Sequence, residues 1–267
     1  MTESLYQVSH MPALFVGHGS PMYAIEENEF VRAWRVLGAE LPKPKAILVV
    51  SAHWETLGTQ VTAMQQPKTI HDFGGFPQAL FDVQYPATGS PELANETIRT
   101  VKSSPVTADD RWGIDHGAWS VLRHIYPHAN IPIVQMSLDI HKSPQQHFDL
   151  AKELAAFRDK RILIIGSGNM VHNLRQVAWD IADDVEYGHD WALEANILLK
   201  KLILENDYKS LINYQSLGRA VQMAAPTPDH FLPLLYALAL KQKDEEITFF
   251  NDKAVMGSLT MTSVKIG

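Results

Sequence analysis

Hydrophobic residues occur along this chain in short continuous runs separated by segments of mixed polarity. Four such runs, rich in β-branched and aliphatic residues, are Ala13–Val16, Ala46–Ser51, Ile131–Met136 and Arg161–Ile165. Continuous runs of this kind are typical of strands that are buried on both faces, as in a parallel sheet covered by helices. The pattern therefore predicts four buried strands.

Segments with a helix-like pattern alternate with these runs. They are Glu26–Leu37, Pro91–Lys102, Gly117–Ile125, Pro144–Phe157, Trp191–Leu204 and Phe231–Lys241. Because strand and helix patterns alternate, we expect an α/β fold with a mostly parallel central sheet and helices on both faces.

Three further segments alternate more in polarity and are expected to form antiparallel or edge strands of this sheet. They are Thr59–Met64, Glu246–Phe250 and Leu259–Val264. Proline and glycine are spread along the chain without a linker-like cluster, and no internal repeat is apparent. We therefore expect one domain that spans residues 1–267.

The composition excludes several classes of partner. The chain has 267 residues, 46% of them hydrophobic, and a net charge of −7 without a basic patch or tail, so neither nucleic acid nor an anionic membrane surface is an expected partner. No run approaches the roughly 18 apolar residues of a membrane helix. The first residues, Met1–Ser4, lack the features of a signal peptide, so we expect a cytoplasmic protein.

Histidine is frequent and cysteine is absent, with 12 and 0 residues respectively. A disulfide framework, a thiolate metal site and a thiol nucleophile are therefore excluded. Any metal site in this chain must use nitrogen and oxygen ligands. Neutral imidazole suits zinc, copper, iron and nickel, so the histidines alone leave the metal open.

Three histidines stand at or just beyond the carboxyl ends of predicted strands. His18 follows the first run, His53 follows the second, and His172 follows the fourth, in the segment Gly166–Asn173. In open α/β sheets, ligands bind at the edge formed by the carboxyl ends of the strands. We therefore expect these three imidazoles to converge on a shared metal site.

Three more histidines lie in loops rich in glycine and proline or at a helix start, where functional residues are frequent. His230 precedes the last predicted helix, and His71 and His116 lie in turn-rich loops. The remaining six are expected to be ordinary surface or core residues: His10, His124, His128, His141, His147 and His189. Glu55 could contact a metal or an imidazole, but we favour a solvated charge.

Other local motifs carry less information. Gly17–Gly19 and Gly166–Asn169 could bind an anion through backbone N–H groups, but neither matches a nucleotide-binding loop. No nucleophile elbow surrounds Ser20 or Ser167. Aromatic residues flank the candidate histidines and would suit a pocket for a flat ring: Trp54, Trp112, Trp119, Phe73 and Phe76.

Six blocks of the sequence, taken together and in this order, resemble one enzyme family. They are Gly17-His18-Gly19-Ser20-Pro21, Ser51-Ala52-His53-Trp54-Glu55, His71–Pro77, Asp115-His116-Gly117, Gly166–Asn169 with His172-Asn173, and Pro228-Asp229-His230. The blocks are similar to those of the extradiol ring-cleavage dioxygenases of the protocatechuate 4,5-dioxygenase catalytic-subunit type. Within that family they look most similar to the 4,5-DOPA dioxygenase group. The resemblance runs from about residue 12 to the C-terminus.

The resemblance implies roles for five histidines. His18 and His53 would be metal ligands, and His230 would complete the site where the protocatechuate enzymes have a glutamate. His172 would be the catalytic acid and base, and a possible fourth metal contact, while His116 would face the substrate as a second catalytic histidine. The implied cofactor is one divalent metal ion per chain, with Fe(II) for turnover and Zn(II) as a frequent occupant.

The implied reaction is the extradiol opening of a catechol such as L-DOPA, by 4,5-cleavage, with O2 as co-substrate. Two alternatives remain at this point: a non-catalytic metal-binding protein of the Memo type, and a zinc hydrolase or a chelatase. The presence of both His116 and His172 favours the dioxygenase. The sequence leaves the oligomeric state open.

Overall fold

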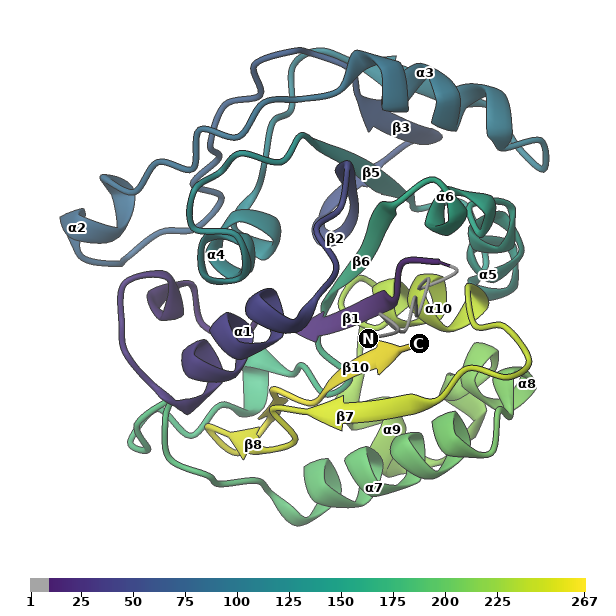
Figure 1. The fold of residues 1–267 in the computed structure, drawn as a ribbon. Helices are drawn as coiled ribbons and strands as arrows, with labels where there is room; N and C mark the ends of the chain where they lie inside the picture. Colours follow the sequence, from purple (N-terminus) through teal and green to yellow (C-terminus); the bar gives the residue numbers. More distant parts are fainter. Residues whose placement is uncertain (1–9) are drawn as a thin grey trace, which may run out of the picture.

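An eight-stranded sheet runs through the centre of the structure, a computed structural model that describes residues 10–267 (Figure 1). The strands lie in the order β4-β3-β5-β2-β6-β1-β10-β7. Their bounds are β1 Ala13–Gly17, β2 Ala46–Thr56, β3 Thr59–Thr62, β4 Val106–Asp109, β5 Ile133–Asp139, β6 Ile162–Gly168, β7 Ile247–Phe250 and β10 Ser263–Ile266. A separate two-stranded sheet consists of β8, Ala254–Val255, and β9, Leu259–Thr260.

The four central strands are parallel. β2 pairs in parallel with both β5 and β6, and β1 pairs in parallel with β6. On one side β10 is antiparallel to β1, and β7 is antiparallel to β10. On the other side β3 is antiparallel to β5, and β4 is parallel to β3. The expected α/β fold with a mostly parallel central sheet and some antiparallel strands is confirmed.

Helices surround this sheet (Figure 1). Their bounds are α1 Glu29–Glu40, α2 Gln78–Phe81, α3 Pro91–Thr100, α4 His116–Ile125, α5 Pro144–Glu153, α6 Ala156–Asp159, α7 Asp190–Leu204, α8 Tyr208–Ile212, α9 Arg219–Ala224 and α10 Leu232–Ala239, with 3-10 turns η1 Pro21–Ala24, η2 Leu174–Gln176 and η3 Tyr214–Ser216.

The alternation of side chains along each central strand divides the core into two layers. Leu14 of β1 packs with Trp34 of α1 on one face of the sheet. Phe15 points to the opposite face, where it packs in a cluster that includes Leu234 of α10. Each fully buried side chain of this kind stabilises the fold by roughly 1.5–3 kcal/mol. Because both faces are covered, the central strands need apolar residues at consecutive positions, which explains their continuous hydrophobic runs.

Several predicted elements have different bounds in the structure. The segment Leu259–Val264 is divided between β9 and β10, which belong to different sheets. Thr59–Met64 corresponds to β3, which is not at the edge because β4 pairs with its outer side. The helix expected over Pro144–Phe157 is divided into α5 and α6.

The N-terminal residues Met1–Ser4, on which the expectation of no signal peptide rests, lie outside the described residues. Within residues 10–267, the helices are all too short or too polar to cross a membrane.

Candidate metal centre

Five histidine side chains lie at the carboxyl edge of the central strands. His18 follows β1, His53 belongs to the distal part of β2, and His172 lies four residues after the end of β6. His116 is the first residue of α4, and His230 lies two residues before α10. The topology thus brings together residues that are more than 200 positions apart in the chain.

An irregularity in β2 places His53 at this edge. β2 pairs with β6 as far as Ser51, and its register with β5 shifts between Val50 and Glu55. The expected strand Ala46–Ser51 therefore continues to Thr56, and His53 lies inside the strand rather than beyond it. A register shift of this kind bends a strand and changes the direction of its side chains.

The glycines at the end of β6 allow the segment before α10 to approach closely. A Cβ atom on Gly168 would lie 2.2 Å from the His230 carbonyl oxygen, which is far inside van der Waals contact. The Asn169 backbone N–H donates to that same carbonyl at 3.0 Å. The Gly166–Asn169 segment thus serves to position His230 against the sheet.

Three imidazole Nε2 atoms converge in the site. The Nε2 atoms of His18 and His53 are 3.0 Å apart. His18, His53 and His230 each offer a ligand atom, and these atoms all lie within 4.8 Å of one another. His230 Nε2 is buried and has no hydrogen-bond partner. A buried nitrogen without a partner is costly, and a bound metal ion would satisfy it, so these residues fit a divalent ion.

Hydrogen bonds set the tautomer of His18. The Ser167 hydroxyl donates to the Gly117 carbonyl, so it accepts from His18 Nδ1–H at 3.1 Å. The proton on Nδ1 leaves Nε2 with a free lone pair, which is the form that binds metal.

Carboxylates lie beside the Nδ1 atoms of two other imidazoles. Asp229 accepts a hydrogen bond from Nδ1–H of His230, and Asp72 lies 3.5 Å from Nδ1 of His53. The Asp229 contact holds the proton of His230 on Nδ1 and directs its Nε2 towards the shared point. Asp72 Oδ2 lies near His53 without forming a hydrogen bond. Asp72 also lies 2.9 Å from His116 Nδ1.

His116 and His172 contact this group of three histidines without belonging to it. The rings of His116 and His53 have centroids 4.0 Å apart, and His172 stacks on His230 with centroids 3.5 Å apart. His53, Asp72 and His116 form a second set of ligand atoms within 4.8 Å of one another. Among the described residues, His172 belongs to neither set.

Burial keeps the imidazoles neutral. It lowers the pKa of His18 and of His53 well below the ordinary value, and neighbouring histidines add to this effect. Burial, followed by the charge of His230, lowers the pKa of His172 to about 3. Burial raises the pKa of Asp72, but its contact with His116 outweighs that effect and lowers it. Neutral imidazoles beside an ionised carboxylate are the protonation states that metal binding requires.

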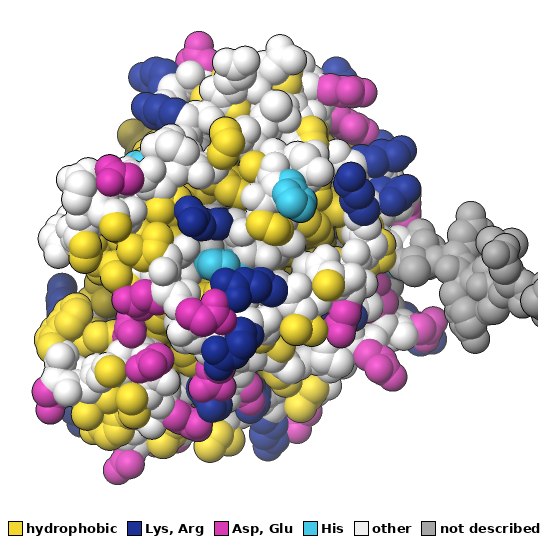
Figure 2. Space-filling model, turned by 60° about the vertical axis from the view of Figure 1, so that its left-hand side comes forward, with side chains coloured by type: hydrophobic (Ala, Val, Ile, Leu, Met, Phe, Trp, Pro, Cys, Tyr) yellow, Lys and Arg dark blue, Asp and Glu magenta, His cyan; other side chains and the backbone are white. Residues whose placement is uncertain are grey.

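A cavity of about 530 Å³ opens above the histidines. Its floor contains the five histidines and Asp72, and its walls are largely apolar. Apart from the floor, its lining includes Pro21, Met22, Phe73, Phe76, Leu174, Val177, Trp179, Met256 and Leu259. On the face drawn in Figure 2, histidine side chains reach the surface at only a few points. Because His18, His116 and His230 are buried, the floor of the cavity is polar and recessed. Its walls suit a flat apolar ring.

Not all the aromatic residues singled out in the sequence lie in this cavity. Phe73 and Phe76 line it. Trp54 and Trp112 instead stack on each other, with 3° between their planes, in a separate surface hollow. Trp119 is fully buried, and its indole N–H donates to the Ile70 carbonyl.

Two other polar residues named from the sequence also lie apart from the metal centre. His71 lies next to Phe73, but its Nε2 contacts the Val83 carbonyl at 2.9 Å and it belongs to neither set of ligand atoms. The side chain of Glu55 lies exposed on β2. Its carboxyl group is nevertheless partly buried by its surroundings, and this burial raises its pKa.

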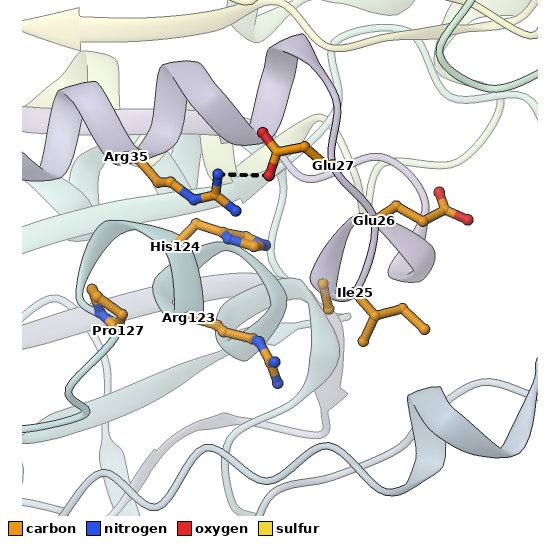
Figure 3. A pocket seen from close by; sticks show the side chains of 8 residues that line it. Ile25, Glu26, Glu27, Arg35, Arg123, His124 and Pro127 are labelled. Atoms are coloured by element: carbon orange, nitrogen blue, oxygen red, sulfur yellow. Dashed lines mark hydrogen bonds and ion pairs between the residues drawn. The ribbon is translucent and has the colours of Figure 1, made fainter.

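A second hollow, of about 310 Å³, lies between η1, α1 and α4 and shares no lining residue with the histidine cavity (Figure 3). Arg35 and Glu27 form an ion pair at 2.6 Å in its lining, and Arg123 lines it as well. His124 lines this hollow, and its Nε2 contacts the Tyr23 carbonyl at 2.8 Å. His124 therefore has a structural partner and lies outside the metal centre.

The residues that lie beside the Nδ1 atoms of these histidines were not identified from the sequence. They are Asp72, Asp229 and Ser167. Two of them carry a local signal, because Asp229 directly precedes His230 and Asp72 directly follows His71. A carboxylate beside a histidine in a turn-rich loop is the pattern that would have indicated them.

The fold and the site define an α/β protein with a buried polyhistidine centre that opens into an apolar cavity. The chain belongs to the family described as the catalytic LigB subunit of aromatic ring-opening dioxygenase, which it matches over residues 4–264.

Curated relatives agree with this family. The chain is 49% identical over 263 residues to a 4,5-DOPA dioxygenase extradiol of Escherichia coli K12, with 97% of this chain and 96% of the relative covered. It is 34% identical to the protein of the same name from Beta vulgaris, with 94% of both chains covered. A crystal structure of an uncharacterized Escherichia coli K12 protein superposes with a TM-score of 0.84 at 42% identity, covering 96% of this chain and 100% of that one. The protein is therefore a ring-opening dioxygenase rather than a Memo-type binding protein or a zinc hydrolase.

Proposed function

We propose that this protein opens the ring of a catechol such as L-DOPA by extradiol 4,5-cleavage with O2. The observation that carries the proposal is the convergence of three Nε2 lone pairs, from His18, His53 and His230, on the floor of a cavity with apolar walls. The family and the names of the curated relatives support it. We also propose a cytoplasmic location.

In this proposal His18, His53 and His230 hold one divalent metal ion, and they fit Fe(II). When bound, Fe(II) supplies coordination positions for the catechol oxygens and O2, together with the redox chemistry that zinc lacks. The carboxylate of Asp229 and the hydroxyl of Ser167 keep the ligand imidazoles in the tautomer that this binding requires.

His172 is proposed as the acid and base. It lines the cavity and stacks on His230, so its imidazole lies beside the position where a catechol hydroxyl would bind. A neutral imidazole there accepts the hydroxyl proton and returns it later in the reaction. His172 is also retained as a possible fourth metal contact, although it lies outside the set of three ligand atoms.

His116 is proposed as the second catalytic histidine, which faces the substrate. Its ring lines the cavity next to His53, and its Nδ1 lies 2.9 Å from Asp72. In the proposed role its ring donates a hydrogen bond to negative charge that develops on the substrate. The walls formed by Phe73 and Phe76 hold the flat ring and exclude water.

The test is anaerobic reconstitution of metal-free protein, followed by oxygen-electrode assays over a panel of catechols that includes L-DOPA. Fe(II) under reducing conditions is expected to restore oxygen uptake and a yellow ring-opened product, whereas Zn(II) is not. Equal turnover with zinc would contradict the redox mechanism. The absence of oxygen uptake with every catechol would contradict the proposed function.

A further inference from the structure

The charges that line the histidine cavity are all of one sign. Its lining contains two carboxylates, Asp72 and Asp183, and no lysine or arginine. Asp72 lies on the floor, where His53 and His116 contact it. Of the two carboxylates, only Asp183 lies away from these histidines, so it is the one that a ligand in the cavity could contact.

Asp183 is held in place by its neighbours. The Tyr23 hydroxyl, from a fully buried residue, donates to the backbone carbonyl of Asp183. The Ser20 hydroxyl donates to its carboxylate. The carboxylate is therefore preorganised at the wall of the cavity, with little conformational entropy left to lose on binding a ligand.

Asp183 lacks a cationic partner within the protein. Among residues 10–267 no lysine, arginine or histidine forms an ion pair with it, although it is half-buried. Burial raises the pKa of Asp183, and the hydrogen bond from Ser20 opposes this shift. A half-buried carboxylate without a counter-charge is stabilised by any cation that binds next to it.

The position of Asp183 relative to the metal centre also fits a substrate side chain. Its partner Ser20 stands two residues after His18, a separation of at most about 7 Å along the backbone. Asp183 and the histidines line the same cavity. A catechol whose oxygens reach the floor would thus extend its ring substituent along the wall that carries Asp183.

We propose that Asp183 binds the protonated amine of the substrate side chain, so that the cavity selects catechols that carry an ammonium group over catechols that carry a carboxylate. This inference rests on the proposed function, since it assigns the other end of the same substrate. It also implies that dopamine, which lacks the carboxylate of L-DOPA, is accepted at least as well as L-DOPA.

The activity test uses three catechols that differ in the charge of a short side chain: dopamine, neutral 4-ethylcatechol and anionic 3,4-dihydroxyphenylacetate. For the Fe(II)-loaded wild type we expect kcat/KM to fall in that order. Asp183→Asn is expected to raise KM for dopamine about tenfold, as the loss of a charge-assisted hydrogen bond predicts, with kcat and the values for 4-ethylcatechol unchanged. The matched control is Asp184→Asn, because Asp184 is exposed and does not line the cavity.

A binding measurement separates this inference from the proposed function. Calorimetric titration of zinc-loaded protein with dopamine and with 4-ethylcatechol requires no turnover. We expect the wild type to bind dopamine more tightly, by a margin that decreases as salt is added and that Asp183→Asn removes. Equal effects of Asp183→Asn on both ligands, or no binding of dopamine by the wild type, would overturn the assignment. Selective dopamine binding without ring cleavage would contradict only the proposed function.

Discussion

The imidazole ring of His172 lies parallel to that of His230, with 3.5 Å between the ring centroids and 5° between the planes. A ring stacked in this way presents its face to its neighbour, and both residues line the cavity. His172 and His230 therefore occupy adjacent but different positions in the site. His230 belongs to the set of three ligand atoms, and His172 lies beside that set.

This arrangement predicts different outcomes for different histidine variants. His18→Ala and His53→Ala are expected to lose bound metal, because each removes one of three converging Nε2 atoms. His172→Ala is expected to keep the metal and lose turnover. Metal content by elemental analysis and oxygen uptake measure the two properties, with exposed His141→Ala as the control. An empty site in His172→Ala would show that His172 is a ligand.

Asp229→Asn is expected to weaken metal binding by roughly 10- to 100-fold. The carboxylate holds the proton of His230 on Nδ1, and an amide holds it less firmly and can present its own N–H instead. Competition with a chelator of known affinity measures the change. Asp110→Asn is the matched control, because Asp110 is exposed and belongs to neither set of ligand atoms. The same affinity in Asp229→Asn and the wild type would refute this role.

Gly168→Ala is expected to destabilise the fold by about 1–3 kcal/mol, which is typical of overpacking, and to weaken metal binding. The new Cβ atom would lie 2.2 Å from the His230 carbonyl, so the segment that carries His230 must move. Gly74→Ala is the control, because a Cβ atom there meets nothing within 4 Å. Denaturant unfolding and metal titration give the two readouts. A Gly168→Ala variant as stable as Gly74→Ala would contradict the close approach.

His147 predicts a pH dependence of stability away from the metal centre. It is fully buried between the Tyr236 hydroxyl and the Asp139 carbonyl, and burial lowers its pKa to about 4. The unfolded chain, with a pKa of about 6.5 at this residue, binds a proton between pH 6.5 and 4 that the native protein does not bind. Stability is therefore lost as the pH falls through this window, by about 3 kcal/mol for this group.

The measurement is the free energy of unfolding of the wild type and of His147→Gln at several pH values. Glutamine can keep both hydrogen bonds but does not titrate, so its stability should fall less steeply below pH 6.5. The exposed control His141→Gln should follow the wild type. Parallel curves for wild type and His147→Gln would rule out this contribution.

The parallel centre of the fold was predictable because its strands are buried on both faces, which leaves continuous apolar runs such as Ala46–Ser51. β4, with only four residues of which two are exposed, has no such signal and was missed. The division of Leu259–Val264 between two sheets was also not predictable, since it depends on which distant strands each half meets.

For the site, position along the strands predicted which part of the sheet would carry His18, His53 and His172, while the roles of the five histidines came from the resemblance to the family. Loop context alone did not distinguish His71 from His116, because both lie in turn-rich loops. That difference is set by tertiary contacts: His116 begins α4 next to Asp72, whereas His71 turns to the Val83 carbonyl.

The proposed metal ligands have an uneven distribution along the chain, with two in the first 53 residues and the third at position 230. A chain synthesised from its N-terminus therefore lacks a complete site until most of the domain exists. Metal uptake should then be among the last events of maturation. From that point the bound ion links β1, β2 and the start of α10, and it adds to global stability in proportion to the logarithm of the free metal concentration.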